Sequence, residues 1–234
     1  MFDIGNVCPN LFIIGAPKCG TSAFVDGLAQ HDEIHVQIKE PRFFDAHTYY
    51  DFESDYPFDD LEQYKRLYQS IEADQYKYRV DASVFNMYSE KSLINIKNFS
   101  GNAKFIVILR NPVEAAKSMH RQRLMYLEKP MREVSDDFCE CWRTLNDRKQ
   151  GHAYPEGCRN KFIFRYDLMY SYQLYIDSMV SIVGRENILF IDYTDYKSNP
   201  QKIFDMVFTF LAVGNIKILN NIVNPSYYIE KKFF

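Results

Sequence analysis

The chain has few of the residues that mark fibrous, disordered or disulfide-bonded proteins. It contains nine glycines and nine prolines in 234 residues, too few for a collagen-like repeat or a long disordered linker. Its five cysteines form no C-x-x-C pair; they are Cys8, Cys19, Cys139, Cys141 and Cys158. This spacing excludes a disulfide framework and the common zinc motifs, so we expect a reducing compartment and no metal site.

The chain also lacks an excess of positive charge and a long apolar run. Lys and Arg total 28 against 31 Asp and Glu, a net charge of −3, which gives no overall field for nucleic acid or anionic lipid. No apolar run approaches the ~20 residues that span a bilayer, and the first residues do not read as a signal peptide. We therefore expect a cytoplasmic protein with no nucleic-acid partner, in which a local basic site remains possible.

What the chain does have is the composition of a globular domain with an aromatic interior. It is 47% hydrophobic, 25% charged and 16% aromatic. No repeat or low-complexity tract divides it, so we predict a single domain over residues 1–234. Apolar strand patterns alternate with helical ones, which is typical of a three-layer α/β fold with a central parallel sheet flanked by helices.

Two strand-to-helix units stand out. Residues 11–15 form a short apolar run that ends in glycine, as expected of a buried parallel strand, and Thr21 or Ser22 can cap the helix after it. Residues 104–110 contain five consecutive apolar residues and end in Arg110. Asn111-Pro112 with Glu114 then predicts a capped helix running towards Met125.

Weaker patterns predict the remaining elements. We expect further strands at 78–81 and 188–191, and a long functional loop or acceptor-side wall at 40–57. The expected helices begin near Asp60, cover 89–99, cover 138–145 with Trp142 buried, run from about 164 to 183, and begin at Asn199-Pro200.

The loop after the first strand has the features of an anion site. Residues 15–22, Gly-Ala-Pro-Lys-Cys-Gly-Thr-Ser, join a strand to a helix N-terminus, where backbone N–H groups and the helix dipole favour negative charge. A Walker loop carries its lysine directly after the second glycine, whereas Lys18 precedes Gly20, which argues against an ATPase. Cys19 resembles a phosphatase nucleophile in position, but the arginine required six residues later is Val25, so Cys19 is interpreted as a small loop residue.

Three motifs together resemble one family. Pro17–Ser22 is similar to the P-K-[SAC]-G-T-[TS] loop of the sulfotransferases that use 3′-phosphoadenosine 5′-phosphosulfate (PAPS). Arg110, which ends a strand, and Ser118, eight residues later, match the 3′-phosphate element of that family. Lys39–Asp45 is similar to the K-E-x-x-F-F-D stretch of the branch that includes heparan sulfate sulfotransferases and bacterial carbohydrate sulfotransferases. Weaker similarity extends to about residue 212.

The resemblance implies a P-loop-like fold and an activity of the EC 2.8.2 type. A sulfuryl group would pass from PAPS, by in-line displacement and without a metal, to a hydroxyl or amine of a carbohydrate or small-molecule acceptor. Lys18 would contact the 5′-phosphate and its bridging oxygen, and Glu40 would accept the acceptor proton. The residues that would bind the donor are Pro17, Lys18, Cys19, Gly20, Thr21, Ser22, Arg110 and Ser118.

Several alternatives remain open at this point. Lys39 would either stabilise the ionised carboxylate of Glu40 or bind the donor. The other candidate bases are His35, His47 and Asp81. If Arg110 and Ser118 do not bind the donor, Arg110 would form an ion pair with Glu114 and Ser118 would be a small residue in helix packing. Phe43 and Phe44 are interpreted as core residues more than as an acceptor wall.

The C-terminal part departs from the resemblance. Family members usually continue with a basic, glycine-containing stretch that closes over the adenosine bisphosphate. Here Asn224-Pro225-Ser226 and Lys231-Lys232 would be its remnant, or the chain is a shortened form. The alternative functions are therefore a shortened nucleotide-binding relative with little catalysis and a P-loop kinase.

Overall fold

A single parallel sheet organises the protein. The computed structural model describes residues 8–50, 53–69 and 75–219. Within these residues five strands, all parallel to their neighbours, form one sheet in the order β2-β3-β1-β4-β5. The strands are β1 (Leu11–Gly15), β2 (Ile34–His35), β3 (Tyr78–Asp81), β4 (Lys104–Leu109) and β5 (Ile188–Asp192). The predicted central parallel sheet is confirmed.

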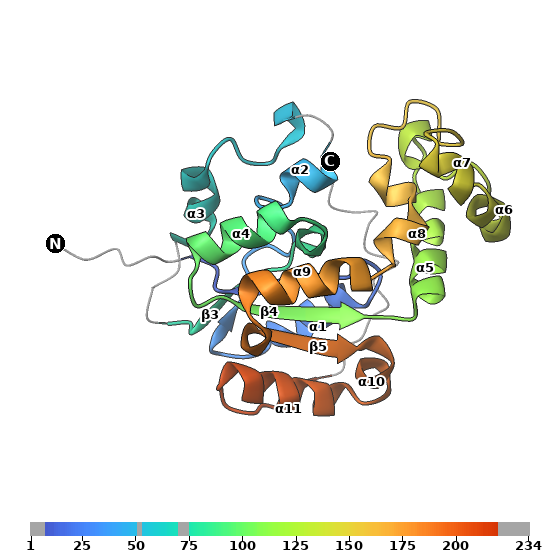
Figure 1. The fold of residues 1–234 in the computed structure, drawn as a ribbon. Coiled ribbons are helices and arrows are strands. Elements are labelled where there is room, and N and C mark those ends of the chain that lie inside the picture. Colours follow the sequence, from blue (N-terminus) through green and yellow to red (C-terminus); the bar gives the residue numbers. More distant parts are fainter. Residues whose placement is uncertain (1–7, 51–52, 70–74, 220–234) are drawn as a thin grey trace.

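Helices flank this sheet, with α4 and α9 on one side of β4 and β5 and α11 on the other (Figure 1). Their bounds are α1 (Thr21–Leu28), α2 (Ala46–Tyr49), α3 (Leu61–Gln69), α4 (Glu90–Phe99), α5 (Pro112–Leu124), α6 (Phe138–Arg143), α7 (Leu145–Lys149), α8 (Tyr166–Met169), α9 (Gln173–Val183), α10 (Tyr193–Ser198) and α11 (Pro200–Leu211). None of the helices in the described part of the chain is both long and apolar enough to cross a bilayer.

The core lies around the two central strands. Every residue of β1 is buried, and so are the four middle residues of β4, as expected of parallel strands covered on both faces. The predicted aromatic interior is confirmed. The Phe12 ring stacks on Phe105 with centroids 5.7 Å apart, and Phe24 stacks on Phe204 at 5.2 Å.

The predicted caps are confirmed for one helix and wrong for another. Asn111 caps α5 by accepting hydrogen bonds from the amides of Val113 and Glu114. At α1 the N-cap is Gly20, with no side-chain cap, so neither Thr21 nor Ser22 has that role. The reason is that Gly20 takes the left-handed turn into the helix, at φ 79°, which places Thr21 inside the first turn.

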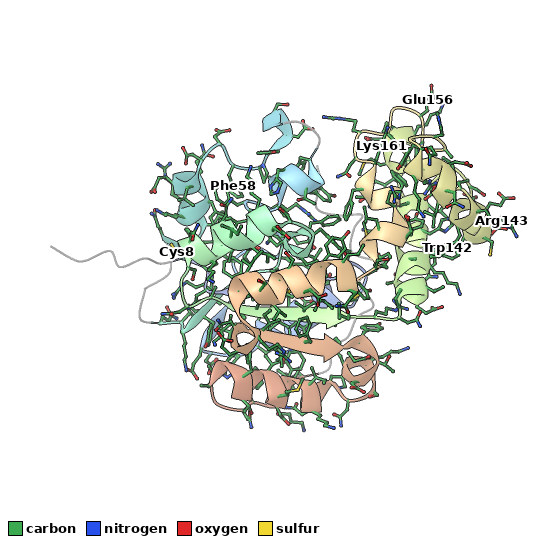
Figure 2. All side chains as sticks on the ribbon, in the orientation of Figure 1. Cys8, Phe58, Trp142, Arg143, Glu156 and Lys161 are labelled. Carbon is green, nitrogen blue, oxygen red and sulfur yellow. The ribbon has the colours of Figure 1, made fainter. Side chains whose placement is uncertain are left out.

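Two predictions in the helical region after α5 are wrong. The expected helix from 164 to 183 is divided into α8 and α9, and the Ser171 hydroxyl between them donates to the Asp167 carbonyl at 2.6 Å. Trp142 is 39% exposed instead of buried. The buried position of α6 is Cys141, so the next residue, Trp142, lies on a different side of the helix, at the rim away from the sheet (Figure 2).

The segment at 40–57 is largely irregular, as predicted. Among its described residues only α2 and a 3₁₀ turn at Glu53–Asp55 are regular. The two C-terminal stretches suggested as a remnant, at 224–226 and 231–232, lie outside the described residues.

Candidate functional site

The two central strands bring the two phosphate-type motifs together. Since β1 and β4 are parallel neighbours, the segments that follow them leave the same edge of the sheet. The Ala16 amide donates to the Ile108 carbonyl at 2.8 Å, and Nη1 of Arg110 donates to the Lys18 carbonyl at 3.3 Å. The predicted meeting of these motifs at the carboxyl edge is confirmed.

The loop before α1 requires glycine at one position. A Cβ added to Gly20 would lie 2.7 Å from Cε2 of Tyr193, and the left-handed φ of Gly20 disfavours any other residue. The first amides of α1 have no acceptor within the helix, and Gly20 offers no side-chain cap. Among the described residues, the loop therefore presents N–H groups that the helix itself leaves unpaired, together with the positive end of the helix dipole.

The environment of Cys19 agrees with its interpretation as a small loop residue. Its side chain is buried, with Sγ 3.7 Å from the Tyr172 hydroxyl oxygen. Burial raises the pKa of the Cys19 thiol to about 11. A thiol with a raised pKa is a poor nucleophile, so the phosphatase reading gains no support.

Lys18 is surrounded by positive charge. Its side chain is half-buried, and burial together with the neighbouring charges of Lys39 and Arg123 lowers the pKa of Lys18 to about 8. A nearby anion is the group that would favour the charged form of this lysine. The loop, its helix and these cations therefore have the charge and the N–H groups that binding of an oxyanion requires.

Arg110 contacts the loop and also the alternative partner Glu114, and its 3′-phosphate role stays a prediction. Its guanidinium lies 4.8 Å from the Tyr193 ring centroid and touches the loop at the Lys18 carbonyl. Nη2 is also 3.9 Å from a carboxylate oxygen of Glu114. Ser118 is half-buried on α5, the helix that begins directly after Arg110, and its ligand role stays a prediction.

Lys39 connects Glu40 to the loop. Nζ of Lys39 donates to Oγ of Ser22 at 2.5 Å and to Oε1 of Glu40 at 3.0 Å. The other carboxylate oxygen of Glu40 accepts from the Arg42 guanidinium. The segment at 39–42 therefore holds the Glu40 carboxylate beside α1, one lysine away from the loop.

Sequence reasoning did not single out Arg42. Its guanidinium lies 3.6 Å from the Tyr49 ring centroid, and Nη1 is 3.5 Å from Oδ2 of Asp45. Asp45 is fully buried, and burial raises its pKa to about 7. Arg42 occupies a variable position of the K-E-x-x-F-F-D pattern. The sequence could have identified it only as a cation two residues after the candidate base.

The rival bases have partners of their own, although Asp81 lies near Glu40: burial, and to a smaller extent the Glu40 charge, raise the pKa of Asp81. Asp81 is fully buried and accepts from the Tyr64 hydroxyl at 2.6 Å, a contact that serves packing. His35 lies on the edge strand β2, against the Tyr76 ring. His47 is exposed on α2 and pairs with the Ser89 hydroxyl at 2.7 Å.

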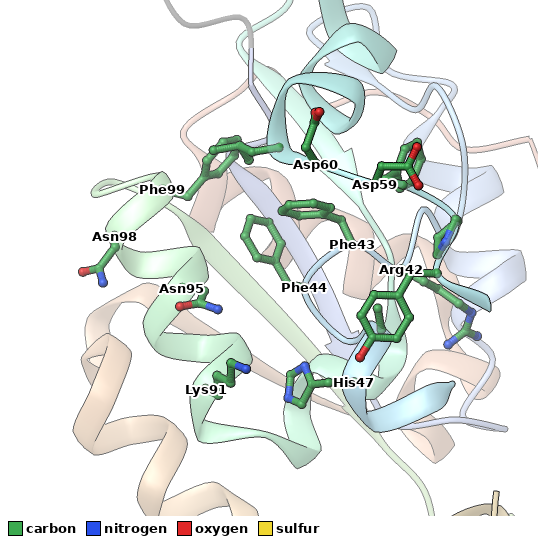
Figure 3. A pocket seen from close by; sticks show the side chains of 15 residues that line it. Arg42, Phe43, Phe44, His47, Asp59, Asp60, Lys91, Asn95, Asn98 and Phe99 are labelled. Carbon is green, nitrogen blue, oxygen red and sulfur yellow. The ribbon is translucent and has the colours of Figure 1, made fainter. Parts of the chain in front are cut away.

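A pocket of about 570 Å³ adjoins the segment that holds Glu40. Arg42 lines it, and Figure 3 shows the Phe43 and Phe44 rings between the α4 side chains on one side and Asp59 and Asp60 on the other. Phe44 is 6% exposed, which agrees with its interpretation as core. The α4 side chains that line the pocket are Lys91, Asn95, Asn98 and Phe99.

Comparison with known proteins gives consistent results. The family model described as "Sulfotransferase domain" matches residues 9–234. Human carbohydrate sulfotransferase 15 is 25% identical over 260 residues; the match covers 88% of this chain but only 44% of that protein. The chain thus spans less than half the length of this curated relative.

Two solved structures are similar in fold. The crystal structure of a sulfotransferase from Alicyclobacillus acidocaldarius has a TM-score of 0.73 at 25% identity, covering 90% of this chain and 83% of the other. Mouse sulfotransferase SULT7A1 complexed with PAP has a TM-score of 0.56 at 18% identity, covering 89% and 60%. With its parallel sheet, its glycine loop and a family model that matches almost its whole length, the chain belongs to the sulfotransferase domain family.

Proposed function

We propose that this chain transfers a sulfuryl group from PAPS to a hydroxyl or amine of a carbohydrate or small-molecule acceptor. The observation that carries the proposal is the bridge made by Lys39, which joins Ser22 of the loop to Glu40. A transferase must hold its donor and the base for its acceptor side by side, because alignment supplies much of the rate.

The donor half of the proposal rests on the loop and Arg110. Lys18 and the first amides of α1 would bind the 5′-phosphate, and the guanidinium of Arg110 suits a second phosphate because it binds oxyanions bidentately. Ser118 would complete the 3′-phosphate site. The complex of mouse SULT7A1 with PAP supports this donor class. The arrangement requires no metal.

The acceptor half rests on Glu40. The acceptor oxygen or nitrogen would attack sulfur as the bond from sulfur to the bridging phosphate oxygen breaks, and Glu40 would take the proton that the acceptor loses. Lys39 and Arg42 would orient the carboxylate towards the acceptor. The products are the sulfated acceptor and adenosine 3′,5′-bisphosphate.

The neighbouring pocket supports a polyhydroxylated acceptor. Asn95, Asn98, Asp59 and Asp60 offer amides and carboxylates that pair with hydroxyl groups, and aromatic rings lie between them. Human carbohydrate sulfotransferase 15 is a relative whose name fits that class. We also propose that residues 1–234 form one domain and work in the cytoplasm, since the number and spacing of the five cysteines do not match a disulfide framework.

Calorimetric titration with adenosine 3′,5′-bisphosphate tests the donor site, with 5′-AMP and Mg-ATP as controls. We expect the bisphosphate to bind best, and Arg110→Ala to weaken it about 10- to 100-fold because charged hydrogen bonds are lost. Preference for Mg-ATP would indicate the kinase alternative. Bisphosphate binding without transfer to any acceptor in a sugar panel would indicate the non-catalytic relative.

A further inference from the structure

Arg123 is a buried cation, two of whose nitrogens have no hydrogen-bond partner among the described residues. It lies in the last turn of α5 and is 4% exposed. Within the described part of the chain, its Nε and Nη1 atoms have no hydrogen-bond acceptor, and its guanidinium lies 4.3 Å from the Tyr126 ring centroid. A buried charge without partners is costly, so a binding partner from outside the chain would relieve it.

Arg123 lies on the inward face of the helix that follows Arg110. The buried residues Ala116, Met119 and His120 share this face of α5. Its charge acts on Lys18 and on Tyr170, whose hydroxyl donates to the Pro17 carbonyl at 3.5 Å, so Arg123 lies near the loop.

Arg123 also lies near the segment that holds Glu40. Its charge acts on Tyr49, the ring on which the Arg42 guanidinium lies. Arg42 in turn holds Glu40. Arg123 is therefore near both the loop that would bind the donor and the base that would serve the acceptor.

No carboxylate of the described residues neutralises Arg123. The carboxylates nearest to this region are Glu40 and Asp45. Both oxygens of Glu40 are engaged by Lys39 and Arg42, and Oδ2 of Asp45 lies 3.5 Å from Arg42. The position therefore combines an unpaired planar guanidinium with the cations Lys18 and Lys39. Such a group matches an oxyanion, which accepts two parallel hydrogen bonds from the guanidinium fork.

We propose that Arg123 binds a sulfate-like oxyanion at the point of transfer, between the Lys18 loop and Glu40. The oxyanion has two possible sources, the sulfuryl group of the donor and an anionic substituent of the acceptor. Identifying the donor and the acceptor as the two sources rests on the proposed function. The binding of an oxyanion by Arg123 is independent of that function, because inorganic sulfate tests it directly.

The test compares the full-length wild type with Arg123→Met and with a matched control, Arg121→Met. Arg121 is an exposed arginine on the same helix whose charge also acts on Lys18. Calorimetry measures the affinity for inorganic sulfate, with and without saturating adenosine 3′,5′-bisphosphate. It also measures the affinities for the bisphosphate alone and for PAPS.

We expect the wild type to bind sulfate and Arg123→Met to bind it at least about tenfold more weakly, with bisphosphate affinity unchanged. Arg121→Met keeps both affinities. A fall in the PAPS-to-bisphosphate affinity ratio of Arg123→Met assigns the oxyanion to the donor. An unchanged ratio, with sulfate binding lost, assigns it to the acceptor.

Thermal unfolding supplies an independent readout. We expect ligand-free Arg123→Met to melt at or above the wild-type temperature, because an unpaired buried charge is removed. Arg123→Lys, which keeps the charge but not the fork, should fold and bind sulfate more weakly than the wild type. The proposal is overturned if sulfate binds the wild type and Arg123→Met equally or not at all, if Arg123→Met loses bisphosphate binding as well, or if it melts well below the wild type.

A failure of the proposed function looks different. In that case the wild type would not bind adenosine 3′,5′-bisphosphate, whereas sulfate would still separate the wild type from Arg123→Met.

Discussion

Two buried arginines in neighbouring regions have opposite surroundings. Arg148 on α7 is 1% exposed, and its guanidinium donates to the Glu133 carboxylate and to the carbonyls of Ala153 at 3.0 Å and Phe164 at 2.9 Å. Arg123 on α5 is almost as buried, but two of its nitrogens have no partner among the described residues. One cation is neutralised by the fold, and the other is not.

The difference separates a structural region from a site. Burial alone raises the pKa of Glu133, but hydrogen bonds from Arg148 and Tyr166 outweigh burial and lower it, so this charge pair is satisfied internally. At the carboxyl edge of the sheet, the charges of Lys39 and Arg123 both act on Lys18, and the Glu40 carboxylate is already engaged by Lys39 and Arg42. Charge left over after folding is what a site for an anion requires.

The largest expected effect is on catalysis at the edge site. Glu40→Gln should reduce transfer about 10²- to 10⁴-fold, since the acceptor proton loses its base, and should leave bisphosphate affinity and unfolding temperature almost unchanged. Steady-state assays with PAPS, together with calorimetry, check both parts.

The matched control is His47→Gln, which removes the rival base on α2. It should retain wild-type turnover, since His47 pairs with Ser89 and not with the loop. Full activity in Glu40→Gln, or its loss in His47→Gln, would assign the base elsewhere.

The next effect is on stability in the structural region. Arg148→Met should lower the free energy of unfolding by about 3–5 kcal/mol, because it leaves the buried Glu133 carboxylate unpaired. Chemical denaturation measures this. A double variant that also carries Glu133→Gln should recover much of the loss. An Arg148→Met protein as stable as the wild type would remove the contrast with Arg123.

The smallest effect is the pH dependence of donor binding. Because the pKa of Lys18 is lowered to about 8, its ammonium is present below that pH and is lost above it. Bisphosphate affinity should therefore be nearly constant from pH 7 to 8 and then fall by up to about tenfold per pH unit, with proton uptake on binding near pH 8. Titrations in buffers of different ionisation enthalpy measure the uptake. If Lys18→Met showed the same fall in bisphosphate affinity above pH 8, another group would be the one that titrates.

Much of the fold could be predicted because its signals are local. A parallel strand buried on both faces is a continuous apolar run, which is how β1 and β4 were found. Asn111 and Asn199, each before a proline, marked the starts of α5 and α11, and both asparagines accept the predicted type of capping hydrogen bond. The meeting of Lys18 with Arg110 followed from the parallel order of these strands.

The errors came from interactions that local patterns do not contain. Trp142 is exposed because Cys141 occupies the buried side of α6, and Gly20 is the cap in place of Thr21 because of its left-handed backbone angle. Arg42 and Arg123 matter through what surrounds them in three dimensions, and neither belongs to a fixed motif position. A sequence shows where a cation is, but it does not show whether the folded chain neutralises that cation.

The adjacency of β1 and β4 has a consequence for folding kinetics. Arg110 and Lys18 are in contact although 92 positions separate them in the chain. The loop therefore gains its arginine only after two distant strands have paired, a slow type of step for a folding chain. A chain that stops before Lys104 would contain every residue of the glycine loop and only half of the site. Bisphosphate binding is accordingly a measure of completed folding, and during refolding we expect it to appear with the last of the sheet.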